Sequence, residues 1–163
     1  MEIFFAKEKH LEFIRQIALN TWPDAFGAIL SKEQINYMLE LMYSVNSLKK
    51  QIHSGHQFIL AKNEKEYFGY ASYEFNYKSK PETKIHKLYV LPKKQGKGVG
   101  NLLMSFIEKE ALKSQNSSLI LNVNRFNKAV QYYHKIGFKT IKEENIDIGN
   151  GFLMEDYVME KHI

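Results

Sequence analysis

The chain has 163 residues, of which 44% are hydrophobic and 25% charged, with a formal net charge of +5 at pH 7. This composition is typical of a globular protein and excludes disordered and fibrous classes. The absence of cysteine excludes disulfides, thiolate metal sites and cysteine nucleophiles. No stretch approaches the roughly 20 apolar residues that span a bilayer, and residues 1–15 lack the apolar core of a signal peptide. We expect one cytoplasmic domain over residues 1–163.

The first elements are predicted from hydrophobic spacing. A short strand is expected at Ile3–Phe5, and apolar residues at helical spacing predict a helix from Lys9 to Thr21. We expect Trp22-Pro23 to end this helix, because the residue before a proline is disfavoured in helical geometry. A second helix is predicted to begin at Ser31, whose side chain is suited to an N-cap, with Gln34 completing a capping box.

The second helix has more apolar surface than one core face requires. One apolar stripe is formed by Ile35, Met38, Leu39 and Met42. A second set of apolar residues lies outside this stripe: Tyr37, Leu41, Tyr43 and Val45. A helix that is apolar on more than one face is covered on both. The second cover could be another subunit, a loop or a substrate cavity, so the pattern is compatible with a homodimer.

The rest of the chain is rich in strands. Three strands are predicted first, followed by a glycine-rich loop and the most regular amphipathic helix of the chain. A further strand, a short helix and a hairpin complete the chain, and the hairpin turns at Gly149-Asn150-Gly151. These segments are, in order, Phe58–Leu60, Tyr67–Tyr77, Lys84–Leu91, a helix with Val99, Leu102, Leu103, Phe106 and Ile107, Ser118–Val123, Asn127–Ile136, Phe138–Ile148 and Phe152–Lys161. The pattern predicts a mixed α/β fold.

The segment from Leu88 to Gly100 suits a phosphate ligand. Three of its last five residues are glycines, so the backbone amides at the start of the helix can approach a phosphate closely. Nearby lysines (Lys93, Lys94 and Lys97) add positive charge. A nucleoside triphosphate loop would need a lysine after Gly100, where Asn101 stands, and the dinucleotide fingerprint also fails. The pattern that fits is Gln/Arg-x-x-Gly-x-Gly/Ala, with Gln95, Gly98 and Gly100.

This loop, with the Leu-Tyr-Val-x-Pro before it, resembles the acetyl-CoA loop of GNAT-type N-acetyltransferases. Downstream, Asn127–Phe138 is similar to the second signature of that superfamily, Asn-x-x-Ala-x-x-x-Tyr-x-x-x-Gly-Phe, with Asn127, Ala129, Tyr133 and Gly137-Phe138. The resemblance covers residues 85–138. It implies a GNAT-like α/β fold with a central, mostly antiparallel sheet of six to seven strands and about four helices. The sheet should splay between the strands that end near Leu91 and Val123.

The resemblance also implies the ligand and its contacts. Acetyl-CoA would be the co-substrate, and no metal is expected. The backbone of Leu88, Tyr89 and Val90 would line the pantetheine arm, and the pyrophosphate would lie on the amides of Gln95, Gly96, Lys97, Gly98, Val99 and Gly100. Asn127 would contact the cofactor, and Tyr133 would protonate the departing sulfur. Without the resemblance, Asn127 would serve as readily as a helix cap, and Tyr133 would more simply be a core residue.

The predicted reaction is direct attack of an amine on the thioester in a ternary complex. An aliphatic amine has a pKa of about 10.4, so a base has to free its lone pair. Lys84 stands where many relatives carry a carboxylate. Strand alternation predicts that Glu82, Lys84, His86 and Leu88 share one face of the sheet, and His86 could accept the proton, directly or through water. The alternative is a histidine on the sheet surface without a catalytic role.

The acceptor is expected to be a primary amine of a small molecule. Aromatic and methionine residues interleaved with carboxylates suit an aliphatic cation, and the predicted substrate-binding residues are Trp22, Tyr37, Met38, Leu41 and Met42. The region around them is similar to bacterial polyamine acetyltransferases of the PaiA type, which suggests spermidine or spermine. Two alternatives stay open: an acetyl-CoA-binding regulatory module with little turnover, and an acetyltransferase for lysine or N-terminal amines of proteins. Basic residues aside, no nucleic-acid signature is present, and neither nucleic acid nor membrane is expected as a partner.

Overall fold

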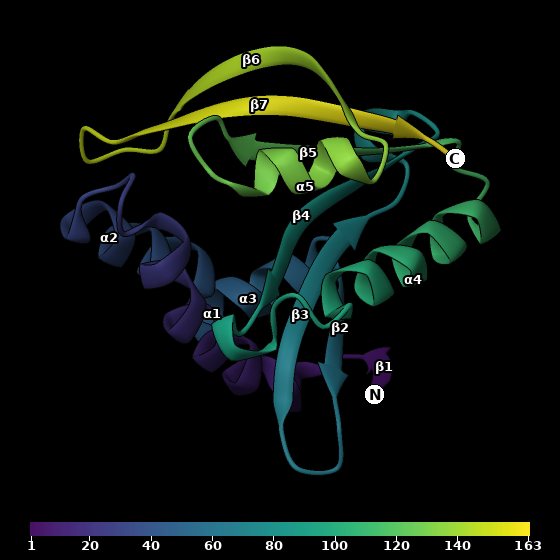
Figure 1. Ribbon diagram of the computed structural model, residues 1–163, viewed down its shortest axis with the longest axis horizontal. Coiled ribbons are helices and arrows are strands. Elements are labelled where there is room, and N and C mark those ends of the chain that lie inside the picture. Colours follow the sequence, from purple (N-terminus) through teal and green to yellow (C-terminus); the bar gives the residue numbers. More distant parts are fainter.

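The computed structural model describes residues Met1–Ile163, which form five helices and seven strands. These are β1 (Glu2–Phe5), α1 (Leu11–Phe26), α2 (Lys32–Tyr43), α3 (Val45–His53), β2 (Gln57–Lys62), β3 (Tyr67–Glu74), β4 (Glu82–Val90), α4 (Val99–Lys113), β5 (Ser118–Asn124), α5 (Ala129–Lys135), β6 (Lys139–Asp147) and β7 (Leu153–His162). The strands form one sheet in the order β1-β2-β3-β4-β5-β7-β6 (Figure 1). Only the β4–β5 pair is parallel. The predicted mixed fold with a mostly antiparallel sheet is confirmed.

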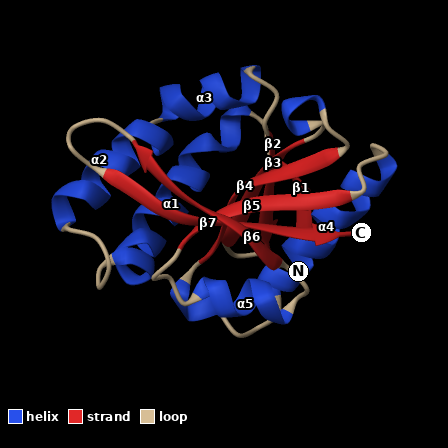
Figure 2. Cartoon of the chain, turned by 90° about the horizontal axis from the view of Figure 1, so that it is seen from above, coloured by secondary structure: helices blue, strands red, loops and turns tan.

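Helices cover both faces of the sheet. Seen from above, α1, α2 and α3 lie on one side, and α4 and α5 lie on the other (Figure 2). Each side has its own hydrophobic core, since strand side chains alternate between the faces. The core under α1–α3 includes Ile14, Trp22, Met38, Leu60 and Tyr70, and the core under α4 and α5 includes Ala71, Ile85, Leu103, Ile107 and Tyr133. No helix of the structure is long and apolar enough to cross a membrane.

The predicted end of the first helix is wrong. Helix α1 continues through Pro23 to Phe26, and the Gly27 amide donates to the Pro23 carbonyl at 2.9 Å. A proline inside a helix costs about 3 kcal/mol, because one backbone hydrogen bond is lost and the ring crowds the preceding turn. Continuing the helix buries Trp22 and Phe26, and full burial of a large apolar side chain contributes about 1.5–3 kcal/mol each. Burial outweighs the local preference.

The second predicted helix divides into two. The Ser31 N-cap is confirmed, because its Oγ accepts from the Gln34 amide at 3.1 Å. Ser44 then ends α2 and begins α3, with its Oγ accepting from the Ser47 amide at 3.2 Å. Helix α3 was not predicted. The Ser44 cap, three residues before Ser47, was the available signal for it.

The sheet splays where it was predicted to. Strands β4 and β5 pair only from Glu82–Ile85 to Ser118–Leu121. Beyond that point β4 stays with β3 and β5 stays with β7, so residues 86–90 of β4 have no strand partner on the β5 side. This edge of β4 offers unpaired backbone groups to a ligand. Figure 1 shows β5, β7 and β6 diverging from β4 above the ends of α1 and α2.

Candidate functional site

The glycine loop is built from backbone conformations that suit glycine. Gly96 and Gly98 have φ angles of 72° and 81°, in the left-handed region, and Gly98 is the N-cap of α4. The Gln95 side chain donates from Nε2 to the Val90 carbonyl at 3.1 Å and so ties the loop to the end of β4. At Gly100, a Cβ would lie 3.3 Å from the Tyr132 hydroxyl. A Cβ at Gly96 or Gly98 would meet open space, and the amides at the start of α4 have no partner within the helix, which suits an anion site.

Two of the three loop lysines are already paired. Lys93 and Lys94 bind the two carboxylate oxygens of Glu66 at 3.1 and 2.5 Å, while Lys97 makes no ion pair and is exposed. Glu66 thus offsets one of the two positive charges of Lys93 and Lys94. Backbone amides, Lys97 and the remaining positive charge of this group are available for a phosphate.

Residues of the second signature lie beside this loop. Asn127 accepts at Oδ1 from the Ala129 amide at 2.9 Å and caps α5, so the capping role considered for it is realised. It precedes Ala129 by two positions, not by the three of the superfamily signature. Tyr133 is buried in α5, and its hydroxyl makes no hydrogen bond within the chain. Burial raises the pKa of Tyr133, so the phenol is protonated at neutral pH.

The predicted alternation along β4 fails after His86, so Leu88 does not lie on the predicted face. Ser72 pairs with Lys87 and Tyr73 pairs with Ile85, which leaves His86 as the extra residue of a β-bulge. His86 and Lys87 consequently both line the cavity on the α1–α2 side of the sheet. Leu88 packs into the core on the opposite side, so it does not share a face with His86.

His86 is held by a carboxylate and a second histidine. Its Nε2 lies 3.0 Å from Glu74 Oε2, and its ring stacks on His56 with centroids 4.0 Å apart and planes inclined by 9°. Burial, with smaller contributions from His56, Lys87 and Lys84, lowers the pKa of His86 to about 3. At pH 7 the ring is neutral, and because a carboxylate only accepts, Nε2–H donates to Glu74, which leaves Nδ1 as the acceptor nitrogen.

The same three residues have donor types that suit a metal ion. His56, Glu74 and His86 bring one ligand atom each within 4.8 Å of one another. However, an ion midway between the stacked rings would lie about 2 Å out of each ring plane, half of the 4.0 Å centroid separation. A histidine nitrogen binds metals at about 2.0–2.1 Å along its in-plane lone pair. Both rings would have to rotate first, so the arrangement fits a hydrogen-bonded pair better than a metal centre.

A cavity of about 80 Å³ lies on the α1–α2 side of the splay. Its 14 lining residues come from α1, α2, β4, β5 and β7 and the segments beside them: Trp22, Phe26, Leu30, Gln34, Met38, Met42, Tyr43, His86, Lys87, Asn122, Asn124, Leu153, Met154 and Asp156. Three of the five predicted substrate-binding residues, Trp22, Met38 and Met42, are among them. The indole Nε1 of Trp22 is buried beside the Tyr43 side chain and has no hydrogen-bond partner of ordinary geometry.

The other two predicted substrate-binding residues lie outside the cavity. Tyr37 donates its hydroxyl to the Ile148 carbonyl at 2.7 Å and packs on Phe152, so it fastens α2 to the β6–β7 hairpin. Leu41 is 47% exposed. The extra apolar surface of α2 is therefore covered in part by the hairpin, in part by the cavity and core, and at Leu41 by nothing within the chain.

Opposite charges are buried together at the base of the splay. Lys84 donates to Asn122 Oδ1, and Asn122 donates from Nδ2 to Asp156 Oδ2 at 3.3 Å. Burial lowers the pKa of Lys84 to about 8, and burial raises the pKa of Asp156. Asp156 is 2% exposed in the chain and lines the cavity, so it is the carboxylate that the cavity offers to a ligand.

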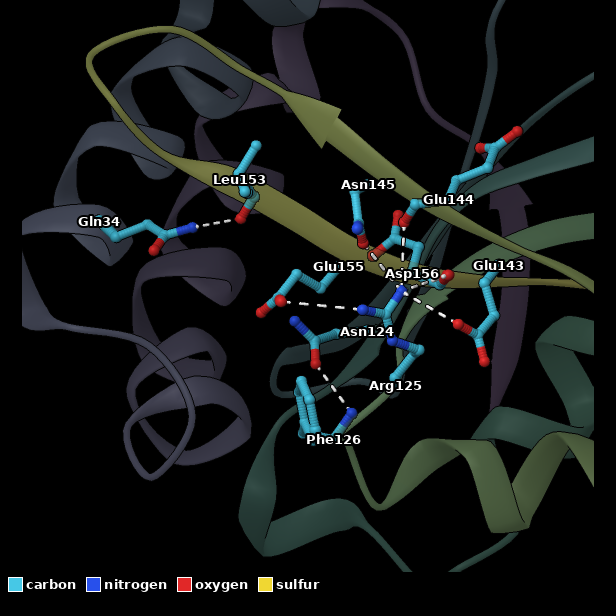
Figure 3. A network of polar contacts seen from close by, with 10 residues as sticks. All are labelled: Gln34, Asn124, Arg125, Phe126, Glu143, Glu144, Asn145, Leu153, Glu155 and Asp156. Atoms are coloured by element: carbon cyan, nitrogen blue, oxygen red, sulfur yellow. Dashed lines mark hydrogen bonds and ion pairs between the residues drawn. The ribbon is translucent and has the colours of Figure 1, made fainter.

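Arg125, after β5, holds the hairpin strands in place around Asp156. Figure 3 shows its guanidinium among β6 and β7, where Nη1 donates to Asn145 Oδ1 at 3.0 Å and Nη2 lies 3.7 Å from Glu155 Oε1. On the α2 side, Gln34 donates from Nε2 to the Leu153 carbonyl at 2.8 Å. These contacts satisfy the outer carboxylates of the hairpin and leave the Asp156 carboxylate facing inward.

Comparison with known proteins agrees with this geometry. The sequence profile of the acetyltransferase (GNAT) domain matches residues 28–161. The chain belongs to the GNAT family. A search of curated proteins gave no match. As a family member the chain is an acetyl-CoA-dependent N-acetyltransferase.

Solved structures share the fold over nearly the whole chain. PaiA N-acetyltransferase from Thermoplasma acidophilum, in complex with coenzyme A, is 24% identical with a TM-score of 0.82 and full coverage of both chains. A GCN5-related N-acetyltransferase from Rhodopseudomonas palustris is 20% identical, with a TM-score of 0.84, covering 99% of this chain and 95% of that one. The ribosomal-protein-S18-alanine N-acetyltransferase from Escherichia coli is 16% identical, with a TM-score of 0.74, covering 99% and 93%.

Proposed function

We propose that this GNAT acetyltransferase acetylates the terminal primary amine of a small aliphatic polyamine. The observation that carries the proposal is the cavity on the α1–α2 side of the splay, which is narrow, walled by aromatic and methionine side chains, and contains the buried carboxylate of Asp156. At about 80 Å³ it takes the end of an unbranched chain and not a bulky acceptor. Aromatic faces with one carboxylate are the groups that bind an alkylammonium.

The residues around the cavity suit each step of the transfer. Asp156 and the aromatic wall would orient the amine. Because the lowered pKa of His86 makes its ring a weak base, the amine proton would leave through water, with Nδ1 of His86 accepting a hydrogen bond in the transfer and Glu74 fixing the orientation of the ring. Bound acetyl-CoA supplies the thioester on the unpaired edge of β4, where backbone N–H groups can stabilise a developing oxyanion. Tyr133, protonated at pH 7, would give its proton to the departing sulfur.

The test is thiol release from acetyl-CoA with a panel of spermidine, spermine, short diamines, amino acids, aminoglycosides and lysine peptides. We expect turnover with the polyamines. Replacing Asp156 with Asn should raise KM for the preferred amine about tenfold, which corresponds to about 1.4 kcal/mol. KM for acetyl-CoA should stay unchanged, because Asp156 lies on the acceptor side of the splay.

A matched control is the neighbouring carboxylate. Glu155 pairs with Arg125 and does not line the cavity, so Glu155→Gln should leave KM for the amine within about twofold, a change of about 0.4 kcal/mol. Preference for lysine peptides over every free amine would replace the polyamine with a protein acceptor. Saturable acetyl-CoA binding without turnover of any amine would favour the regulatory-module alternative.

A further inference from the structure

Lys87 is a buried lysine without a partner inside the acceptor cavity. The residue is 8% exposed, lines the cavity beside His86, and forms neither a hydrogen bond nor an ion pair. Its Nζ lies 5.2 Å from the centroid of the Tyr43 ring, a cation–π contact that is its single polar interaction. An unpaired buried ammonium is costly, and this one is placed where the substrate amine has to bind.

Lys84 shows that a buried lysine in this chain can have polar and charged partners. Both lysines project from β4 and both are less than a tenth exposed. The Nζ of Lys84 donates to Asn122 and lies near the Glu144 and Asp156 carboxylates, and Lys84 does not line the cavity. The two side chains thus form a natural pair for comparison, one with its amine occupied and one with its amine free.

Lys87 meets the chemical requirements of an acceptor. Burial lowers the pKa of Lys87 to about 8, so roughly one chain in ten holds the free amine at pH 7, against fewer than one in a thousand for an exposed lysine. Lys87 lies within residues 86–90, the β4 segment that has no strand partner on the β5 side. A primary amine, partly deprotonated and fixed beside the acetyl-binding edge, is what the enzyme acts on.

We propose that Lys87 is an internal acceptor, which the enzyme acetylates with its own acetyl-CoA when no amine occupies the cavity. The Nζ lone pair attacks the thioester carbonyl carbon, the C–S bond breaks and an amide bond forms. The proton lost from Nζ passes to His86 or solvent, and coenzyme A leaves as the thiol. The inference requires the acetyl-CoA chemistry of the family, and it does not depend on which amine is the natural acceptor.

Self-acetylation would close the cavity. The modification adds three heavy atoms to a space of about 80 Å³, which holds only two or three water molecules at about 30 Å³ each. It also removes the charge of Lys87. An enzyme supplied with acetyl-CoA but starved of amine would therefore switch itself off, and bound amine would protect it.

The experiment is peptide mass spectrometry on the purified full chain after incubation with acetyl-CoA and no amine. We expect the mass of one acetyl group on Lys87, gained at least tenfold faster than on Lys84 or on the exposed Lys50 and Lys109. Adding a saturating acceptor amine should suppress the label on Lys87 and leave the exposed lysines as before. Equal labelling of Lys84 and Lys87 would mean that burial alone sets the rate, and would overturn the proposal.

Activity after preincubation gives a second readout. Wild-type enzyme should lose activity in proportion to the label on Lys87, whereas Lys87→Arg, which keeps the charge but cannot be acetylated there, should show no time-dependent loss. Parallel inactivation of both proteins would refute the mechanism. An enzyme that turns over amines while Lys87 stays unlabelled would refute this inference and leave the proposed function intact.

Discussion

The cofactor side and the acceptor side of this protein are constructed differently. On the proposed cofactor side, the candidate binding groups are backbone amides of Leu88–Val90 and Gln95–Gly100, in a loop where Gly96 and Gly98 have positive φ. On the acceptor side, side chains from α1, α2, β4, β5 and β7 converge on one cavity. A site made of local backbone leaves a readable pattern in the sequence. A site made of distant side chains has no such pattern, and only the fold brings its members together.

Charge is also handled differently in the two regions. The loop lysines Lys93 and Lys94 are paired with Glu66 at the surface, where ion pairs contribute little to stability. The acceptor side buries Lys84, Lys87 and Asp156, where a missing partner costs several kcal/mol per charge. We therefore expect substitutions in the cavity to change both stability and acceptor binding, and substitutions in the loop to change acetyl-CoA binding.

The largest expected effect lies between the two regions, at Tyr133. Replacing Tyr133 with Phe removes the proposed proton donor and should lower kcat about a hundredfold, the lower range for general acid catalysis, with both KM values nearly unchanged. Steady-state kinetics with each substrate varied in turn measures this. Tyr132→Phe is the matched control, since its hydroxyl donates to Asn101 at 3.0 Å, and kcat should stay within about twofold. Equal loss in both variants would contradict the assignment of Tyr133.

Lys87→Met should stabilise the fold at neutral pH. The pKa of Lys87 is about 8 in the folded chain and 10.5 when unperturbed, so both states are protonated below pH 8 and the full cost of burying the charge is present. Between pH 8 and 10.5 the unfolded chain holds the additional proton, and the stability of the wild type rises with pH. The gain from Met should be on the order of 2 kcal/mol at pH 7 and should shrink as the pH approaches 10.

Urea unfolding at several pH values measures this difference, and Lys84→Met is the contrasting variant. Removing Lys84 takes a nearby cation away from the buried Asp156 carboxylate, so this variant should be less stable than the wild type at pH 7. A destabilised Lys87→Met would show that Lys87 has a stabilising partner after all.

The smallest effect is expected in the glycine loop. Gly98→Ala keeps the side chain small but forces a left-handed backbone at a cost of about 1–2 kcal/mol, so KM for acetyl-CoA should rise severalfold while KM for the amine stays constant. Gly55 also has a positive φ, with open space around it, but lies in the turn before β2. Gly55→Ala should carry a similar strain without any change in KM, and a change there would remove the distinction between the two regions.

Much of the fold could be predicted from the sequence, and the errors occurred where contacts between distant residues override a local preference. Hydrophobic spacing and turn residues gave the strands, the hairpin at Gly149–Gly151 and the amphipathic helix α4. The predicted end of α1 was wrong because the effect of Pro23 on the helix is a local preference, and the burial of Trp22 and Phe26 outweighs it. The bulge at His86 could not be predicted, because it is defined by pairing with Ser72 and Tyr73 on another strand.

The candidate site likewise has features set by residues that are close in the sequence and features set by long-range packing. The sequence by itself determined the glycine loop and the helix that follows it, because a phosphate site at a helix start is made of residues that are neighbours in the chain. The position of Tyr133 was also available from the sequence, through its spacing to Gly137-Phe138. Only the tertiary structure decided that Lys87 faces the cavity beside His86, that Asp156 is buried there, and that Tyr37 and Leu41 lie outside it. Those facts depend on the position of the bulge in β4 and on the antiparallel pairing of β7 with β5. Such long-range packing involves residues far apart in the chain, so no short segment of the sequence specifies it.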